Sequence, residues 1–403
     1  MAASWQGLMK RLAKVFALQV LVAICVVVLF DTAAYLFLPK DAVRFAPKYR
    51  QKEVRAERNG LLSQVYDYPK GYFRADVQLG FDIAANVGTS RYAIGDSTFD
   101  IFSNSLGCFD RNEPSVRSSE YVYFAGDSFT WGYARYEKKF ATVYEARTGR
   151  VSLKCGVTHT GQRHQYRKFS RIAQALGRYP TRVFVGYFIN DPANDFAHPH
   201  STVIDGFLVD VVELKNGALV QRNLGKIAEA IHNAQNGKNA AAHSGAKSVT
   251  RRLREFLRRY SLTAHLMVNA VIQVKYLAKI YLIPGASKSF YESSRQFDFE
   301  KSYLHHAVTA ANREAIKQWA NDAKANGYEL VFVLIPPKHS FDDIDYYRSL
   351  RAFLSSLEIS YLDLTEAFRT AKKTESELYW GKDLHWNDEG NEFVGKLLAE
   401  RFP

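Results

Sequence analysis

Short apolar runs alternate with helical patterns along the chain from about residue 120 onward. The runs are rich in β-branched and aromatic residues and end at turn residues, which is typical of strands. They span residues 121–125, 151–155, 182–188, 330–335 and 360–364. Apolar positions at helical spacing predict helices at 166–176, 312–326 and 389–401. This alternation predicts an α/β fold, with helices on both faces of a mainly parallel sheet of about five strands.

Two regions interrupt this rhythm and divide the chain. Residues 40–119 form a lead-in segment before the first strand and contain the turn-like run Asn104-Ser105-Leu106-Gly107. Residues 197–310 form a long insertion between the third and fourth strands. The α/β domain therefore comprises residues 120–196 and 311–403 in this interpretation.

The insertion itself contains three recognisable stretches. It opens with a predicted hairpin over 207–220, turning at Lys215-Asn216-Gly217. The small polar residues of 233–248 predict a mobile loop. Residues 251–260 then place apolar and arginine side chains at helical spacing. We interpret this basic amphipathic helix first as one packed on the domain with a solvated arginine face, and docking on an anionic membrane is the alternative.

The N-terminus carries a nearly unbroken apolar stretch over residues 15–38. At about 1.5 Å per residue, a helix of this length crosses a bilayer core of roughly 30 Å. Lys10, Arg11 and Lys14 precede it, as expected for a cytoplasmic N-terminus. A cleaved signal peptide is the rival interpretation, but the apolar run continues beyond the small residues that would form its cleavage site. We therefore predict that residues 1–39 are an uncleaved transmembrane anchor and that the rest lies outside the cytoplasm.

Composition and net charge limit the classes of binding partner that we expect for this protein. The net charge of +13 and the pI near 9.4 favour anionic neighbours, such as lipid headgroups or acidic polysaccharide. No nucleic-acid-binding motif occurs, and the three cysteines form no zinc-binding pattern, so neither nucleic acid nor a metal or other cofactor is predicted. Cys108 and Cys155 either pair in an oxidising compartment or are two buried thiols.

Polar residues follow two of the predicted strands, where open α/β sheets place their sites. The first strand runs into Gly126-Asp127-Ser128, and Ser128 would begin the next helix, where free N–H groups favour developing negative charge. The third strand runs into Ile189-Asn190-Asp191, and the Asn190 amide is a candidate hydrogen-bond donor to an oxyanion. Each motif taken singly is also an ordinary turn.

A third motif lies near the C-terminus. In Asp383-Leu384-His385-Trp386-Asn387 the Asp and His are two positions apart, so in an extended loop they project to the same side. An Asp beside a His can fix the tautomer of the imidazole and stabilise it once it is protonated. A capped helix start with an incidental His is the alternative.

Together, these three motifs resemble those of the SGNH family, also called GDSL hydrolases, and occur in the family's order. The resemblance covers about residues 100–196 and 311–403 and implies a flavodoxin-like three-layer fold. It also implies that Ser128 is the nucleophile, His385 the general base and acid, and Asp383 its orienting partner. The oxyanion hole would comprise the Ser128 N–H, the Asn190 side chain and a backbone N–H from the second block. The Asp-x-His spacing is similar to that of membrane-associated members linked to O-acetylation of alginate and peptidoglycan.

The second block departs from the family pattern. The glycine expected three residues after Gly156 is His159, so His159 or Gly161 would supply the backbone N–H. His159, Asp191 and the two tryptophans beside the proposed catalytic residues are candidates for substrate binding. Trp131 and Trp386 would form a sugar-stacking wall, or else pack in the core.

The function implied is that of a serine esterase or O-acyltransferase acting on acyl esters of a cell-envelope polysaccharide, with acetyl the favoured acyl group. Hydrolysis and transfer proceed through the same acyl-enzyme, so the sequence does not distinguish between them. The predicted anchor favours a role beside the machinery of polysaccharide synthesis or export. Two alternatives are a non-catalytic carbohydrate-binding or scaffold protein with the same fold, and a membrane-lipid esterase.

Overall fold

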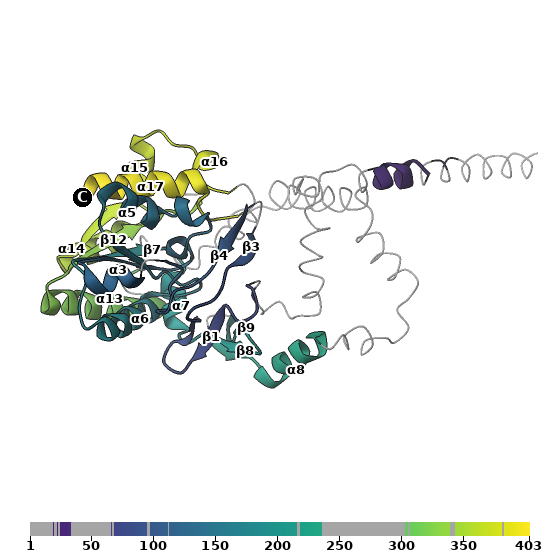
Figure 1. Cartoon of the computed structure of the whole chain (residues 1–403), viewed down its shortest axis with the longest axis horizontal. Helices are drawn as coiled ribbons and strands as arrows, with labels where there is room; N and C mark the ends of the chain where they lie inside the picture. Colours follow the sequence, from purple (N-terminus) through teal and green to yellow (C-terminus); the bar gives the residue numbers. More distant parts are fainter. Residues whose placement is uncertain are drawn as a thin grey trace, which may run out of the picture. The chain divides into compact units, whose positions relative to one another are not determined.

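The computed structural model of the 403-residue chain describes most of the α/β domain and the lead-in segment (Figure 1). The described residues are 19, 22, 25–33, 66, 68–94, 97–111, 113–215, 218–235, 303–304, 307–338, 343–380 and 383–403. Contacts divide the chain into two compact units, one of residues 1–60 and 233–296 and one of residues 61–232 and 297–403. The second unit contains the sheet and the candidate site.

In the first unit, residues 19, 22 and 25–33 are helical, and Cys25 is an exposed free thiol. Among the described residues, none of the helices combines the length and the apolar character needed to cross a membrane. Most of the predicted anchor, and the predicted basic helix over 251–260, lie outside the described residues. So does all but the beginning of the predicted loop over 233–248.

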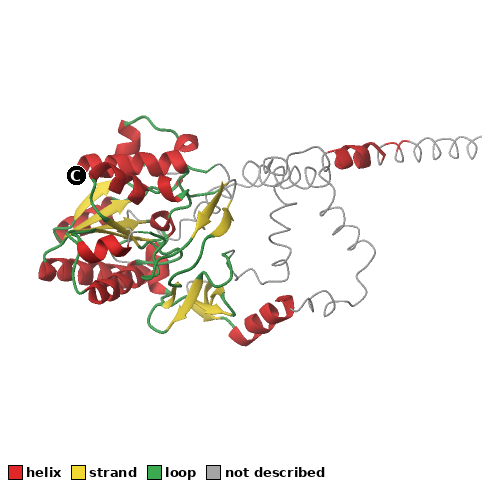
Figure 2. Ribbon diagram, viewed as in Figure 1, coloured by secondary structure: helices red, strands yellow, loops and turns green. Residues whose placement is uncertain are grey.

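A five-stranded parallel sheet lies at the centre of the second unit (Figure 2). Its strands are β5 (Val122–Gly126), β6 (Ser152–Lys154), β7 (Arg182–Tyr187), β12 (Glu329–Leu334) and β13 (Ser360–Asp363). All five predicted strands are confirmed, and their order across the sheet is β13-β12-β7-β5-β6. Counted along the chain this is the order 2-1-3-4-5 of flavodoxin-like folds, in which the topological switch point lies between β5 and β7.

Helices cover both faces of the sheet. The helices are α3 (Glu113–Ser118), α4 (Ser128–Trp131), α5 (Phe140–Thr148), α6 (Gln162–Leu176), α7 (Asp191–Phe196), α8 (Leu224–Gln235), α13 (Ala307–Asn326), α14 (Arg348–Ser356), α15 (Leu364–Thr370), α16 (Glu375–Leu378) and α17 (Asp388–Arg401), with one 3-10 turn, Tyr136–Lys138. Helices α6, α13 and α14 contribute to one hydrophobic core, and α5, α15 and α17 to the other. The three predicted helices are thus confirmed as α6, α13 and α17.

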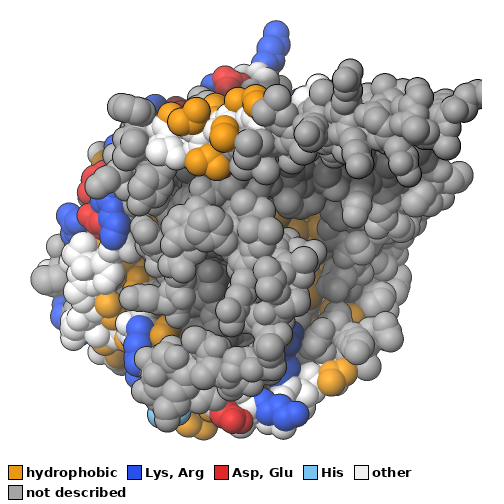
Figure 3. Space-filling model, turned by 90° about the vertical axis from the view of Figure 1, so that its right-hand side faces the viewer, with side chains coloured by type: hydrophobic (Ala, Val, Ile, Leu, Met, Phe, Trp, Pro, Cys, Tyr) orange, Lys and Arg blue, Asp and Glu red, His pale blue; other side chains and the backbone are white. Residues whose placement is uncertain are grey.

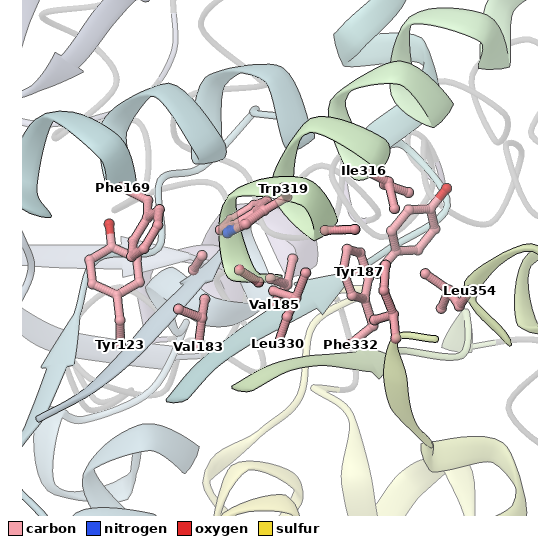
Figure 4. Close-up of a cluster of buried hydrophobic side chains, with 14 of the residues drawn as sticks. Tyr123, Phe169, Val183, Val185, Tyr187, Ile316, Trp319, Leu330, Phe332 and Leu354 are labelled. Atoms are coloured by element: carbon pink, nitrogen blue, oxygen red, sulfur yellow. The ribbon is translucent and has the colours of Figure 1, made fainter. Parts of the chain in front are cut away.

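The strands alternate between the two cores with a period of two, as a sheet buried on both faces requires. Along β12, Leu330, Phe332 and Leu334 point into the first core, whereas Val331 and Val333 point into the second. Figure 4 shows the first core, where the ring of Trp319 from α13 lies over the strand side chains. This dense packing makes the sheet a rigid support for the loops at its carboxyl edge.

The lead-in segment contains four strands that the sequence pattern did not predict. They are β1 (Phe73–Asp76), β2 (Gly80–Ile83), β3 (Ser90–Ile94) and β4 (Ser97–Ile101), paired as two antiparallel hairpins. Their side chains form a third, mainly aromatic cluster that includes Trp131 and Tyr133 from the α/β domain. A disulfide between Cys108 and Cys155 joins the segment to the end of β6, which decides between the two interpretations of these cysteines.

Asn104 forms the expected turn, since its side-chain oxygen accepts hydrogen bonds from the N–H groups of Leu106 (3.0 Å) and Cys108 (3.1 Å). The lead-in is also held by a buried ion pair between Lys168 and Asp82 (2.5 Å). The segment therefore packs on the α/β domain within the same unit.

The hairpin predicted over 207–220 is confirmed for the strands on either side of its predicted turn, but it does not extend back to Phe207. Two hairpins occur: β8 (Ser201–Ile204) pairs with β9 (Phe207–Asp210), and β10 (Val212–Lys215) pairs with β11 (Ala218–Gln221). The first turns at Asp205 (φ 56°) and Gly206 (φ 83°), a two-residue turn whose positive φ angles match the twist of paired strands. The prediction missed this first turn and extended the strand before Lys215 back over β9.

The charged side chains are dispersed on one face of the described surface. On the face drawn in Figure 3, the described Lys and Arg side chains lie at several separate positions. The described part of this face shows no continuous basic patch.

Candidate active site

Ser128 lies directly after β5, as the first residue of α4. The turn before it is so tight that a Cβ atom on Gly126 would lie 2.0 Å from Thr130 Oγ1 and 2.9 Å from the Gly186 carbonyl oxygen. Gly126 also has a φ of +146°, which side chains rarely adopt. A glycine is therefore required here for the chain to turn and bring Ser128 to the edge of the sheet.

Asp127 caps this short helix, with its carboxylate accepting a hydrogen bond from the Phe129 N–H (3.0 Å). Burial raises the pKa of the Asp127 carboxyl, against the hydrogen bonds from Phe129, Asn190 and Ser128 and the charge of His385, which lower it. Asp127 thus fixes the turn from below and is enclosed by the residues of the candidate site.

The loop before α17 brings the predicted Asp and His to Ser128. His385 Nε2 lies 2.7 Å from Ser128 Oγ, and His385 Nδ1 lies 2.5 Å from Asp383 Oδ1. The same Asp383 oxygen accepts the backbone N–H of His385 (2.9 Å). Ser128 Oγ is also 3.3 Å from Asp127 Oδ2, but the shorter distance makes His385 the better acceptor of the serine proton.

Burial raises the pKa of Asp383, but the hydrogen bonds and charge of His385, together with the charge of Lys338, outweigh this and hold the pKa below its usual value. Asp383 therefore stays a carboxylate. The hydrogen bond that it accepts places the imidazole proton on Nδ1 and leaves Nε2 free to accept from Ser128. This is the arrangement that a serine nucleophile and its base require.

Aromatic rings hold the imidazole in place. The centroid of the Tyr133 ring lies 4.0 Å from that of His385, and the centroid of Phe129 lies 4.8 Å from it. Tyr133 is itself fixed by a hydrogen bond of 2.6 Å between its hydroxyl and that of Tyr68 in the lead-in segment. No sequence motif pointed to Tyr133 or Tyr68, because their proximity to His385 arises only from the folding of the lead-in onto the domain.

The turn after β7 places Asn190 near Ser128. Asn190 lies beside Asp127, which it hydrogen-bonds, and its side-chain oxygen is buried with no hydrogen-bond partner among the described residues. Asp191 holds the turn, since its carboxylate accepts the N–H of Phe188 (3.2 Å) and the side-chain amide of Gln162 (2.8 Å). Asp191 is fully buried, so the prediction that it contacts substrate is wrong. Its hydrogen bonds stabilise the turn after β7 instead.

The second block takes an unusual conformation at His159. Its φ of +58° lies in the left-handed region that glycine favours, so the backbone keeps a glycine-like shape although the residue is histidine. The imidazole lies against the Tyr66 ring, tilted by 38°, at 3.9 Å between ring centroids, and burial lowers the pKa of His159 to about 3, which keeps it neutral. Gly161 begins α6, and its α-carbon lies against α7, where a Cβ would meet Asp195 Oδ1 at 2.4 Å. Its part in an oxyanion hole stays a prediction.

The sugar-stacking wall predicted from the tryptophans is wrong. Trp131 and Trp386 are 0% and 1% exposed. Trp131 packs in the aromatic cluster with its indole N–H donating to the Tyr72 hydroxyl (2.9 Å), and Trp386 packs in the core beneath α17. All four residues of α4 are buried, Trp131 among them, and the ring of Trp386 lies against those of Phe129 and Phe140.

Among the described residues, no three His, Cys, Asp or Glu side chains come together as a candidate metal site. The chemistry available from the described side chains at Ser128 is that of a nucleophile, a base and hydrogen-bond donors.

A family model described as "SGNH hydrolase-like domain, acetyltransferase AlgX" matches residues 295–403. The matched segment contains Asp383 and His385 but not Ser128. Ser128 lies earlier in the chain, directly after β5, and the fold brings it to His385. A comparison with curated protein sequences finds no match.

Solved structures with some similarity include three esterases or lipolytic proteins. A putative lipolytic protein of the G-D-S-L family from Desulfitobacterium hafniense is 13% identical, with a TM-score of 0.33 over 70% of this chain and 99% of that one. A lipase/acylhydrolase from Enterococcus faecalis is 10% identical (TM-score 0.34, 70% and 95%). The acetylxylan esterase Axe2 from Geobacillus stearothermophilus is 11% identical (TM-score 0.34, 71% and 95%).

The matched family model and the three motifs in the family's order agree with each other. Over residues 295–403 the chain is thus similar to an SGNH hydrolase-like domain, and its site brings together the serine, histidine and aspartate that an esterase or acyltransferase of this kind would use.

Proposed function

We propose that this protein is a serine esterase or O-acyltransferase that acts on acyl esters, with acetyl the favoured group, of a cell-envelope polysaccharide. The observation that carries the proposal is the continuous path from Ser128 Oγ to His385 Nε2 (2.7 Å) and from His385 Nδ1 to Asp383 (2.5 Å). A non-catalytic protein with this fold would have no need to hold these three side chains in hydrogen-bond contact.

In the proposed reaction, Ser128 Oγ attacks the ester carbonyl while His385 Nε2 takes the serine proton. The tetrahedral intermediate then expels the alcohol oxygen, which receives this proton from His385 and leaves the acyl group on Ser128. Water or a sugar hydroxyl attacks the acyl-enzyme next and gives its proton to His385, which returns it to Ser128 Oγ as the bond between the acyl group and Ser128 breaks. Asp383 stabilises the imidazolium that forms in each half of the reaction.

The negative oxygen of the intermediate would be stabilised by the Ser128 N–H, the Asn190 side chain and a backbone N–H of the second block. We favour His159 as the donor in that block, because its backbone has the left-handed conformation expected of the family's glycine. Gly161 remains the second candidate.

Two observations support a location outside the cytoplasm. The disulfide between Cys108 and Cys155 is of a kind that persists in oxidising compartments, and residues 15–38 have the composition of a membrane anchor. At that location the accessible acyl acceptors are envelope glycans and water. We therefore also propose that the protein acts beside the machinery of polysaccharide synthesis or export.

The test uses the full chain in mild detergent, with a fluorophosphonate probe and 4-nitrophenyl acetate. We expect labelling and turnover in the wild type, and a loss of at least about 10³-fold in Ser128→Ala. Ser376→Ala, an exposed serine remote from the site, is the matched control and should behave as the wild type. Equal behaviour of the wild type and Ser128→Ala in both assays would contradict the proposal.

A second arm separates the two outcomes of the acyl-enzyme. An acetyl donor ester is supplied together with a neutral oligosaccharide acceptor, and the products are followed by mass spectrometry. Acetylated oligosaccharide indicates transfer, and free acetate alone indicates hydrolysis. Turnover confined to detergent-dispersed lipid esters would contradict a glycan substrate.

A further inference from the structure

Lys338 lies close behind the Asp383–His385 loop but takes no part in the reaction proposed above. It follows β12 after Pro336-Pro337, and it is only 8% exposed. Its ammonium donates to the backbone carbonyl oxygen of Trp380 (2.6 Å) and to that of Asp383 (3.2 Å). A carboxylate oxygen of Glu375 lies 3.8 Å from the same nitrogen.

These contacts join two parts of the chain that are far apart in sequence. The ammonium can only donate hydrogen bonds, so the two carbonyls directed at it hold Trp380 and Asp383 beside the end of β12. The neighbouring Tyr379 hydroxyl adds a second link, since it donates to the Pro336 carbonyl oxygen (2.7 Å). The loop is therefore tied to the end of a central strand, which is among the most rigid parts of the fold.

The link reaches the candidate site through one residue. Asp383 gives its carbonyl to Lys338, and its carboxylate holds both the backbone N–H and the ring of His385. A shift of the Asp383 backbone would move its carboxylate, and the imidazole would lose its alignment with Ser128. Misplacement by about 1 Å can lower a rate by about 10²-fold.

We propose that Lys338 is a positioning residue, which holds the Asp383 backbone so that the carboxylate keeps His385 aligned with Ser128. The proposal rests on the function proposed above. A buried ammonium is expensive to desolvate, and a purely structural link at this point needs no charge. Lys338 acts through Asp383 and does not reach the reacting atoms in this arrangement.

The test compares Lys338→Met, which keeps the length of the side chain and removes its charge and donors, with Lys338→Arg, which keeps both. Lys373→Met is the matched control, because Lys373 lies just before α16, is partly exposed and pairs with Glu377 (3.6 Å). With 4-nitrophenyl acetate, we expect Lys338→Met to lower kcat by about 10- to 100-fold and to change KM by less than about threefold. Lys338→Arg should recover part of kcat, and Lys373→Met all of it.

A second readout follows the Asp383–His385 hydrogen bond without requiring turnover. The proton on His385 Nδ1 should give a far-downfield NMR signal in histidine-labelled protein, assigned by its loss in His385→Ala. We expect this signal to move or vanish in Lys338→Met and to persist in Lys373→Met.

Thermal unfolding of each variant shows whether its kinetic and NMR measurements were made on folded protein. Folded Lys338→Met with wild-type kcat and an unchanged downfield signal would overturn the proposal. If Lys338→Met does not fold, Lys338→Gln replaces it, with the same expected direction and the same overturning result. If the wild type and Ser128→Ala are equally inactive, the proposed function fails, and the downfield signal alone decides the place of Lys338.

Discussion

The two halves of the candidate site are held by different means. On the serine side, Ser128 stands at a buried turn where backbone atoms approach so closely that Gly126 leaves no room for a Cβ atom. On the histidine side, His385 and Asp383 lie on a loop, and their side chains are 18% and 17% exposed. Hydrogen bonds from side chains hold this loop in place.

The difference teaches where each half is vulnerable. Close backbone packing resists small changes in hydrogen bonding but cannot accept added atoms. A loop held by hydrogen bonds accepts changes in shape, but the alignment of its side chains depends on each bond. Substitutions on the serine side should therefore lower stability, whereas those on the histidine side should lower activity in a protein that still folds.

The largest effect is expected from Asp383→Asn on the histidine side. The amide oxygen can still accept the His385 backbone N–H, so the loop keeps its shape, but the imidazole loses the carboxylate that fixes its tautomer. We expect kcat to fall by about 10³- to 10⁴-fold with little change in thermal unfolding. Asp345→Asn, an exposed acid paired with Arg348, is the control. A loss of less than tenfold would break the comparison.

Gly126→Ala should give the largest loss of stability on the serine side. The added Cβ would meet Thr130 Oγ1 at 2.0 Å, at a φ of +146°. Overpacking and backbone strain together predict a loss of about 3–5 kcal/mol in the free energy of unfolding, measured by chemical denaturation. Gly149→Ala has a positive φ (69°) but open space around it, so it should lose only about 1–2 kcal/mol. Equal losses in the two variants would show that close packing is not what limits Gly126.

Lys139 tests the burial of the serine side through pH. Its stem lies against Gly132 at the end of α4, and burial lowers the pKa of Lys139 from 10.5 to about 7. Between these values the unfolded chain binds a proton that the folded protein has released, so stability rises with pH across this window. Lys139→Met should remove a rise of about 3–4 kcal/mol, measured by denaturation from pH 7 to pH 10. The exposed Lys396→Met should leave the rise intact, and a rise that survives in Lys139→Met would contradict the assignment.

The smallest effect is expected from Trp380→Phe. The Trp380 indole N–H donates to the Tyr133 carbonyl oxygen (2.9 Å), and this is one of several bonds that hold the histidine loop. Its loss should lower the free energy of unfolding by about 1 kcal/mol and kcat by a few-fold. A loss of kcat above tenfold would mean that this single bond, and not the set of them, aligns His385.

The sheet was predictable because its strands carry a local signal. Each is a short apolar run whose alternate residues enter opposite cores, and Pro336-Pro337 ends the fourth run where β12 ends. The four strands of the lead-in were missed, since each has only four or five residues and pairs across a turn that the local pattern did not reveal. The pairing of β9 with β8 was missed for the same reason.

The sequence by itself determined the class of fold and the candidate chemical groups, because motif spacing and residue periodicity are properties of neighbouring positions. Ser128, Asp383, His385 and Asn190 could be named before any coordinates. Only the tertiary structure decided that Trp131 and Trp386 face the core, that Cys108 pairs with Cys155, and that Tyr133 and Lys338 support the histidine loop. These depend on contacts between distant segments, which packing of the whole domain selects and no local pattern encodes.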